Sequence, residues 1–356
     1  MKTVFHGKKI SGILTVLPET ESFFEDEAEN YSFPVKQTMR LKKVMGYEKH
    51  RVAKPETSSS DMSLYGMRYL LENGLLRPEE VGAIICVTLT PDHFVPHTSN
   101  IIHGSFDFSQ DVVCMDILQG CCGFLMGVME GFALLSCMPD KKVVLFNTDV
   151  ISHKVSKRDR NSYPLVGDAT TVTILENDPN ASDLHFVMRT DSLRRDIVKI
   201  PAGGSRLPCS PETGEMKDDG EGNFRSLDNL RMNGSEVFRF VQEDVPPLIN
   251  EALSDAGWDK DEVEYFFFHQ PNRFMLRKLA EKLGVPYEKV PMDIVEQFGN
   301  TSGATVPMTI THACPELMCE GLHKVCMSAF GSGMTWGVLT GEIGNMDFCR
   351  MIVSDC

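Results

Sequence analysis

The stretch Asp116-Ile-Leu-Gln-Gly-Cys-Cys-Gly-Phe124 joins an apolar, strand-like run at 112–117 to a segment, reaching Pro139, that is apolar on nearly every face. A helix that is apolar all round is buried rather than amphipathic, so this pattern predicts a strand followed by a buried helix. Cys121 and Cys122 lie at the junction. The first turn of a helix presents unpaired backbone N–H groups and the positive end of the helix dipole, and both favour a thiolate. The pattern therefore predicts a nucleophilic cysteine of lowered pKa, with two ordinary core cysteines as the alternative.

The composition is that of a globular protein. The chain has 356 residues, of which 42% are hydrophobic and 24% charged, and a net charge of −15. No surplus of Lys and Arg is available to neutralise phosphates, so we expect no nucleic-acid partner. The apolar run near 121–138 is short and interrupted by glycines and Glu130, and we expect no membrane span. The 11 cysteines lack zinc spacing and no secretory segment opens the chain, which predicts reduced thiols, a cytoplasmic location and no metal.

An internal similarity indicates two related halves. Leu71-Glu-Asn-Gly74 resembles Ser254-Asp-Ala-Gly257, and each is followed by a short acidic connection and a strand-like apolar run. Both copies read as a helix end, a glycine stop and a buried strand. A loop-like segment at 176–183 separates them. We therefore predict a duplicated α/β fold, in which residues 1–180 form the half with the cysteine pair and residues 181–356 form the other half.

The second half places polar residues at the ends of predicted strands. Tyr265-Phe-Phe-Phe268 runs directly into His269, and ligand sites in α/β sheets lie at such carboxyl ends. A compact polar loop presents Asn300, and the glycine-rich turn within 329–337 brings backbone N–H groups close to a ligand. Taken singly, these are a core histidine, a turn asparagine and a hairpin. Together with the thiol, they are the groups that thioester chemistry needs.

At these residues the chain resembles the ketoacyl-acyl-carrier-protein synthase III family of the thiolase superfamily, from Lys9 to about Glu342. Six motifs occur in the order of that family: Asp116-x4-Cys121-x-Gly-Phe124, Gly167-Asp168, Met232-x-Gly-x-Glu-Val-Phe238, His269-Gln-x-Asn272, Gly299-Asn-Thr-Ser302 and Phe330-Gly-x-Gly-x-Thr-Trp-Gly337. The resemblance implies a thiolase-like fold, with two duplicated α/β halves and central mixed sheets in an α-β-α-β-α arrangement. It further implies an active site between the halves and a homodimer.

The same resemblance implies a two-step reaction. Cys121, not Cys122, accepts an acyl group while backbone N–H groups of Cys121 and Ser332 hold the oxyanion. A malonyl thioester then loses carbon dioxide as His269 and Asn300 donate hydrogen bonds to its thioester oxygen. The carbanion attacks the acyl-enzyme and gives a 3-ketoacyl product for fatty-acid, lipid or polyketide synthesis. The implied partners are acyl-coenzyme A or acyl-carrier protein and malonyl-carrier protein, with coenzyme A or phosphopantetheine thioesters as substrates and no permanently bound cofactor.

The resemblance also marks positions for substrate contact. Those for substrate or coenzyme A are Arg160, Asn272, Phe238, Gly234, Phe330 and Val95, and those for docking an acidic carrier protein are Arg239 and Arg273. The family tryptophan that stacks on the coenzyme A adenine is replaced near Arg40. Val95 replaces an aromatic residue that crosses the dimer interface, which predicts room for a longer or branched acyl group.

Two alternative functions remain open. A non-decarboxylating acyltransferase of the same fold would pass the acyl group to an alcohol or an amine. The retained His269 and Asn300 argue against it, because such donors stabilise an enolate. A non-catalytic partner subunit of a heterodimeric condensing enzyme is the second alternative, and such a subunit need not keep the thiol and both donors.

Overall fold

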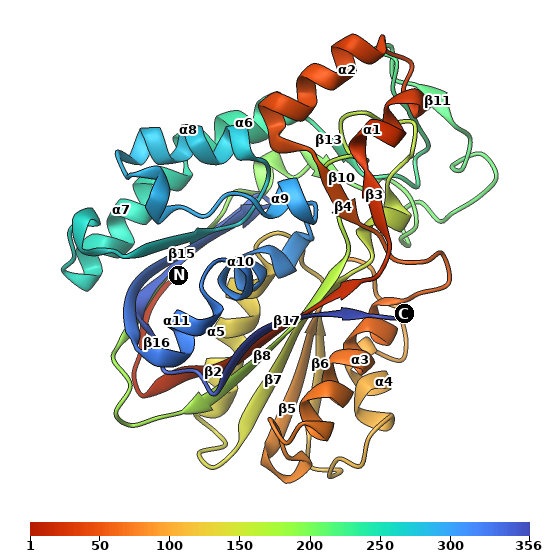
Figure 1. Cartoon of the computed structure of the whole chain (residues 1–356). Coiled ribbons are helices and arrows are strands. Elements are labelled where there is room, and N and C mark those ends of the chain that lie inside the picture. Colours follow the sequence, from red (N-terminus) through yellow and green to blue (C-terminus); the bar gives the residue numbers. More distant parts are fainter.

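Two mixed β-sheets, each with helices on both faces, make up the computed structural model of residues 1–356 (Figure 1). The first sheet has the order β17 (Phe348–Ser354), β2 (Lys8–Pro18), β8 (Ala169–Asn177), β7 (Lys142–Asp149), β5 (Val81–Val87) and β6 (Val113–Ile117). The second has the order β1 (Lys2–Phe5), β9 (Leu184–Thr190), β16 (Thr335–Gly344), β15 (Leu322–Gly331) and β14 (Tyr265–Phe268). Three two-stranded sheets pair β3 (Glu21–Phe23) with β4 (Lys49–Arg51), β10 (Val198–Lys199) with β13 (Arg231–Met232) and β11 (Lys217–Asp218) with β12 (Phe224–Arg225).

The two sheets repeat one pattern of strand pairing. In the first, β2 and β8 are antiparallel, β8 and β7 are antiparallel, and β7 and β5 are parallel. In the second, β9, β16, β15 and β14 pair in the same sequence of directions. The similar segments 71–74 and 254–257 end α3 (Ser59–Glu72) and α7 (Val245–Ala256), which lead through 3-10 turns to β5 and β14. The predicted duplication is therefore confirmed.

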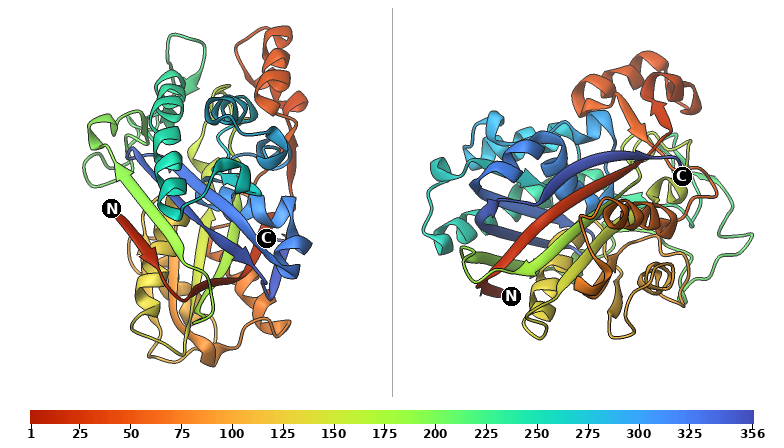
Figure 2. Two further views of the ribbon diagram at one scale, coloured as in Figure 1. Left: turned by 90° about the vertical axis from the view of Figure 1, so that its left-hand side faces the viewer. Right: turned by 60° about the horizontal axis from the view of Figure 1, so that its bottom comes forward.

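The terminal strands cross between the halves. The predicted boundary between the halves, at residue 180, lies in the turn between β8 and β9. The two ends of the chain do not follow this division, because β1 belongs to the second sheet and β17 to the first. β17 pairs in parallel with β2, and Figure 2 shows these blue and red strands side by side. The tail beyond Asn345, which lies outside the motifs of the sequence analysis, thus completes the first sheet.

Three groups of helices separate and cover the sheets. The central core joins both sheets through α5 (Gly123–Leu135) and α10 (Thr305–Ala313). A second core packs α3 and α4 (Thr98–Gly104) on the outer face of the first sheet. A third packs α6 (Gly234–Glu243), α7 and α8 (Arg273–Leu283) on the outer face of the second. This is the predicted α-β-α-β-α arrangement. The remaining helices are α1 (Phe24–Glu27), α2 (Val35–Leu41), α9 (Ile294–Gln297) and α11 (Pro315–Glu320).

The all-apolar helix α5 is buried because sheets lie on two of its sides. Phe124, Leu125, Val128 and Phe132 have no exposed surface and belong to the central core. A Cβ added at Gly127 would overlap the side chain of Leu145, so the glycine lets the helix approach the first sheet closely. The prediction of a strand and then a buried helix at 112–139 is confirmed.

No helix of the structure combines the length and the apolar character needed to cross a membrane.

Candidate active site

The two adjacent cysteines face different surroundings. Both lie between β6 and α5; Cys121 is partly exposed and lines a cavity, whereas Cys122 is buried in the central core. The Cys122 Sγ donates a hydrogen bond to the Ala329 carbonyl at 3.4 Å. A Cβ added at Gly331 would overlap the Cys121 Cβ and lie 2.8 Å from its Sγ, so only glycine fits at this point of β15. Cys121 is thus the thiol that a substrate reaches.

The electrostatic environment of Cys121 opposes the predicted thiolate. The pKa of this thiol is raised to about 11, chiefly by burial and to a smaller extent by the carboxylate of Asp149. Hydrogen bonds from the backbone N–H groups of Cys121 and Ser332 lower the pKa but do not offset burial. The prediction of a lowered pKa was therefore wrong, because desolvation outweighs the backbone donors at this position. The two backbone N–H groups nevertheless converge on Sγ, as the resemblance implied for an oxyanion site.

His269 follows the last residue of β14, as predicted. Its backbone N–H donates to the Ser328 carbonyl and so continues the parallel pairing with β15 by one residue. The side chain is buried, with Nδ1 2.7 Å from Thr305 Oγ1 and the ring centroid 5.5 Å from that of Phe330. Burial lowers the pKa of His269 to about 3. The imidazole is therefore neutral at physiological pH.

Asn300 lies in a loop that binds the backbone of the other half. Its N–H donates to the Leu165 carbonyl, and its carbonyl accepts the Gly167 N–H. Gly299 precedes it with φ +82°, and a Cβ there would lie 2.6 Å from the Val166 carbonyl oxygen. The Asn300 Oδ1 accepts the backbone N–H of Ser302, which has φ 56°, an uncommon value for a residue with a side chain. The Asn300 amide nitrogen is thus left for a partner in the cavity.

Contacts between the halves bring the three groups together. Cys121 and Asn300 line the same cavity, of about 660 Å³, with Ser302 and Ser332. His269 does not line it but packs against Phe330, the residue before Gly331 on the strand that touches Cys121. His269 also contacts Thr305, five residues after Asn300. A thiol from the first half and an imidazole and a carboxamide from the second therefore lie around one place.

The remainder of the cavity combines an apolar wall with basic groups. Its apolar lining includes Leu89, Phe94, Leu118, Ile200 and Leu230, and its basic lining includes His153, Lys154 and Lys199. The segment 152–163 has the charged and polar composition of a surface loop, yet its Asp159, Ser162 and Tyr163 are buried. The signal that could have identified His153 and Lys154 is their place just beyond the carboxyl end of β7.

None of the six predicted substrate or coenzyme A contacts lines this cavity. Asn272 caps α8 by accepting the Met275 N–H at 2.9 Å, and Phe330 packs on His269. Phe238 stacks on Phe274 with centroids 5.6 Å apart, and Gly234 is exposed at the start of α6. Val95 is 79% exposed on an apolar loop. In this chain these positions therefore cap a helix, pack against aromatic rings or lie on the surface, and their contact with substrate stays a prediction.

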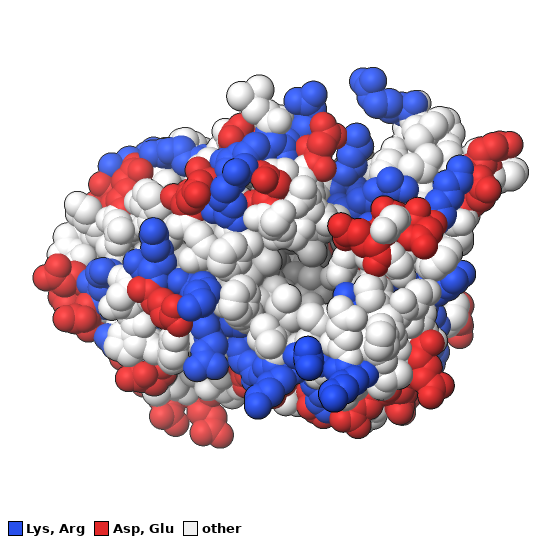
Figure 3. Space-filling view, turned by 90° about the horizontal axis from the view of Figure 1, so that it is seen from above, with Lys and Arg blue, Asp and Glu red and all other residues white.

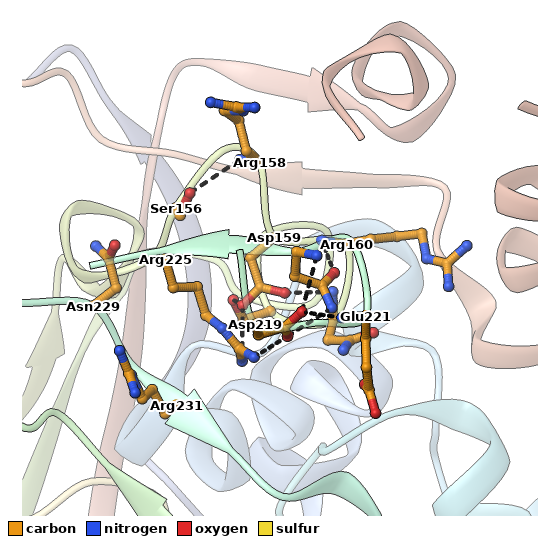
Figure 4. Close-up of polar contacts among 12 residues, drawn as sticks. Ser156, Arg158, Asp159, Arg160, Asp219, Glu221, Arg225, Asn229 and Arg231 are labelled. Carbon is orange, nitrogen blue, oxygen red and sulfur yellow. Dashed lines mark hydrogen bonds and ion pairs between the residues drawn. The ribbon is translucent and has the colours of Figure 1, made fainter. Parts of the chain in front are cut away.

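Arg160 is held away from the cavity by a polar network (Figure 4). Its backbone N–H donates to Asn223 Oδ1, and its guanidinium lies over the ring of Phe33 at 3.3 Å. Arg225 lies between the carboxylates of Asp159 and Asp219 and ties the two segments together. The Arg160 side chain, which was expected to contact coenzyme A, thus packs against other residues of this chain.

The two predicted docking arginines differ in availability. Arg239 is exposed on α6 and pairs only with its helix neighbour Glu236. Arg273 is half-buried, pairs with Glu296 at 2.5 Å and donates to the Lys43 carbonyl at 3.1 Å. Viewed from above, the molecule is hollowed near its centre, and side chains of both signs, Lys and Arg as well as Asp and Glu, lie around the hollow (Figure 3).

Asp149 offers a test of the electrostatics of the thiol. Its Oδ1 accepts the Leu89 N–H at 2.6 Å and the Thr88 hydroxyl at 3.1 Å, contacts that an asparagine oxygen preserves. Burial raises the pKa of Asp149 to about 6, so above that pH its negative charge opposes ionisation of Cys121. We expect Asp149→Asn to lower the Cys121 pKa by up to about one unit.

The measurement is the rate of iodoacetamide labelling of Cys121 from pH 6 to 10, followed by mass spectrometry. The variant is expected to react several times faster than the wild type above pH 7, with the difference shrinking towards pH 6 as Asp149 becomes protonated. Equal rates across the range would show that the carboxylate does not act on the thiol.

The five-layered fold is that of the thiolase-like condensing enzymes. Residues 115–192 match the family 3-oxoacyl-[acyl-carrier-protein] synthase III, and residues 253–343 match its C-terminal part. A Campylobacter jejuni protein assigned as a 3-oxoacyl-[acyl-carrier-protein] synthase 3 is 30% identical over 95% of this chain and 94% of its own. The chain belongs to this family, and its activity is the condensation of acyl thioesters to 3-ketoacyl products.

Solved structures give the same result. The crystal structure of the 3-oxoacyl-(acyl-carrier protein) synthase from Burkholderia xenovorans LB400 has a TM-score of 0.91 and 29% identity, and each chain covers 99% of the other. The synthase III of Aquifex aeolicus has a TM-score of 0.79 and 26% identity, over 94% of this chain and 100% of its own. The predicted fold, family and condensing activity are thereby confirmed.

Proposed function

We propose that Cys121, His269 and Asn300 carry out the two half-reactions of this condensing enzyme. The observation that carries the proposal is their arrangement: Cys121 and Asn300 line one cavity, and the neutral imidazole of His269 packs on Phe330 and Thr305, which adjoin Gly331 at Cys121 and the Asn300 loop. A neutral imidazole suits hydrogen-bond donation to a developing oxyanion, because no proton has to be added first.

In the first half-reaction, the Cys121 sulfur attacks the carbonyl carbon of an acyl thioester. The backbone N–H groups of Cys121 and Ser332, which already point at the sulfur, would hold the oxyanion of the tetrahedral intermediate. The sulfur–carbon bond of the substrate then breaks, and the departing thiol takes the proton that Cys121 loses. Because burial raises the Cys121 pKa, loss of this proton during the attack fits the site better than prior ionisation of the thiol.

In the second half-reaction, a malonyl thioester enters and loses carbon dioxide. His269 and Asn300 would donate hydrogen bonds to its thioester oxygen, where the negative charge of the enolate develops. The new carbanion attacks the acyl carbonyl, a carbon–carbon bond forms, and the Cys121 sulfur leaves and regains a proton. The products are a 3-ketoacyl thioester, carbon dioxide and free Cys121.

We propose acyl-coenzyme A or acyl-carrier protein as the acyl donor and malonyl-carrier protein as the extender. The basic cavity residues His153, Lys154 and Lys199 suit the phosphate of a phosphopantetheine arm, and exposed Arg239 suits an acidic carrier. No resident cofactor takes part in these steps. Free thiols at all 11 cysteines support a cytoplasmic location in this proposal.

Docking through Arg239 predicts a selective kinetic effect. Arg239→Glu reverses an exposed charge, so we expect KM for malonyl-carrier protein to rise about tenfold at low salt. KM for malonyl-pantetheine, which lacks the carrier, is expected to stay within twofold. The check is steady-state kinetics with both extenders, and Lys282→Glu on the neighbouring helix α8 serves as a charge-matched control. A parallel rise for both extenders would contradict docking at Arg239.

We also propose a homodimer, supported by an unpaired edge strand and nearby exposed apolar residues. β6 ends the first sheet, and Phe94, Val95 and Leu118 are 81%, 79% and 74% exposed. The cavity extends to Phe94 and Leu118, so the partner would close its apolar end. Light scattering tests the oligomeric state, and a monomeric mass for the active protein would exclude the homodimer.

With Val95 as the residue that reaches across the dimer interface, we expect acyl chains longer than acetyl to be accepted.

The decisive experiment incubates the protein with a panel of acyl-coenzyme A thioesters of two to twelve carbons and then adds malonyl-carrier protein. Mass spectrometry is expected to find the acyl group on Cys121 first and the 3-ketoacyl-carrier product afterwards. Acyl transfer to an alcohol or an amine without release of carbon dioxide would instead favour the non-decarboxylating acyltransferase. Absence of both acylation and product would favour a partner subunit. Strict preference for acetyl would refute the role given to Val95.

A further inference from the structure

The ring of His269 has one side-chain partner, and the direction of that hydrogen bond decides what the histidine presents to the substrate. Nδ1 lies 2.7 Å from Oγ1 of Thr305, the first residue of α10, and both side chains are buried. A hydroxyl has a single proton, so Thr305 either donates to Nδ1 or accepts from it. If it donates, the neutral ring carries its proton on Nε2. If it accepts, the proton is on Nδ1 and Nε2 is an acceptor.

A second oxygen competes for the Thr305 proton. The carbonyl of Ser302 lies 3.0 Å from Oγ1, but this carbonyl already accepts the backbone N–H of Thr305. Nδ1 is the nearer acceptor and has no other donor. The opposite direction leaves no local group unpaired either, because Nδ1–H would donate to Oγ1 and Oγ1 to the Ser302 carbonyl. Neutral histidine favours the Nε2–H form in water, and the role proposed for His269 requires a donor at Nε2; both favour donation from Thr305 to Nδ1.

We infer that Thr305 is a positioning residue that donates its proton to His269 Nδ1 and thereby keeps the proton of the neutral ring on Nε2. In this form Nε2–H is the donor required at the thioester oxygen of the malonyl substrate. The inference rests on the role proposed above for His269. It adds the device that selects the tautomer, since a neutral imidazole with its proton on Nδ1 would direct a lone pair at the developing oxyanion.

Two variants of Thr305 separate tautomer selection from packing. Thr305→Val keeps the shape and removes the hydroxyl, whereas Thr305→Ser keeps the hydroxyl. For the valine variant we expect the rate of condensation to fall about 10- to 100-fold, as for other residues that orient a functional histidine. Acylation of Cys121, measured by mass spectrometry, is expected to stay within twofold of the wild type. The serine variant is expected to restore most of the condensation rate.

Nitrogen NMR of the wild-type protein labelled with ¹⁵N-histidine reads the tautomer without reference to activity. The two ring nitrogens have widely separated shifts in a neutral imidazole, and His269→Asn assigns the signal. We expect Nε2 to be protonated. A proton on Nδ1 overturns the inference, and so does a valine variant that condenses at the wild-type rate or loses both half-reactions together. If the wild type forms no 3-ketoacyl product, the proposed function fails, while the NMR result still decides the tautomer.

Discussion

Cys121→Ala is expected to abolish the mass increase on incubation with an acyl thioester and to lower product formation by a factor of roughly 10⁴ or more. The reason is that the acyl group has no other thiol to accept it in the cavity: Cys121 is the one cysteine that lines it. Both half-reactions pass through a covalent bond to this sulfur. The loss should therefore appear with every acyl donor and be unaffected by substrate concentration. Intact-protein mass spectrometry and a product assay measure it.

The neighbouring residue is the matched control. Cys122 is buried in the central core, with its Sγ against the Ala329 carbonyl, and burial raises the pKa of its thiol strongly. Cys122→Ala is expected to acylate at close to the wild-type rate and to lose about 1 to 2 kcal/mol of unfolding free energy through the small cavity it creates. Acylation that survives in Cys121→Ala but disappears in Cys122→Ala would reverse the assignment.

His269→Ala and Asn300→Ala are expected to lower condensation about 10²- to 10³-fold each while acylation of Cys121 continues. Acylation uses backbone donors at Cys121 and Ser332, which neither substitution removes. Decarboxylation creates an enolate oxygen whose proposed donors are these two side chains. The variants should therefore accumulate acyl-enzyme, which mass spectrometry detects directly. Loss of acylation in both variants would contradict this division of roles.

The pH dependence of condensation provides a second test of His269, namely whether its imidazole is neutral during the reaction. Burial lowers the His269 pKa to about 3, so the ring stays neutral as the pH falls from 8 to 5. The rate constant for condensation by preformed acyl-enzyme should then show no loss with an apparent pKa near 6.5. His323→Ala, which removes a histidine paired with Glu264 at 2.9 Å, is the control for loss of an imidazole elsewhere. A rate that declines with a pKa near 6.5 and loses this dependence in His269→Ala would contradict a neutral donor.

Local patterns predicted the fold closely. The helix ends at 71–74 and 254–257, the buried helix after the cysteine pair and the strand that ends before His269 all occur where expected. Each depends on interactions within a few residues: a glycine stop or a run of apolar residues. The duplication was visible for the same reason, because each half repeats such a local unit.

The walls of the cavity were predicted less well, because they depend on surroundings that motifs do not contain. Arg160 matches the family pattern, yet Phe33 and the loop at Asn223 hold it in internal packing. His153 and Lys154 line the cavity although their segment had the composition of a surface loop. Thr305 had no signal of its own, since its importance arises from contact with a residue 36 positions away.

By itself, the sequence determined much of the order of helices and strands and the two related halves, and it predicted the thiol, imidazole and carboxamide, because short-range periodicity, caps and motifs carry this information. Only the tertiary structure decided the direction of the Cys121 pKa, the walls of the cavity and the partner of His269. The physical reason is that desolvation and hydrogen bonding depend on which distant segments exclude water around a group. The same helix terminus that favours a thiolate in water therefore holds a protonated thiol when two sheets enclose it.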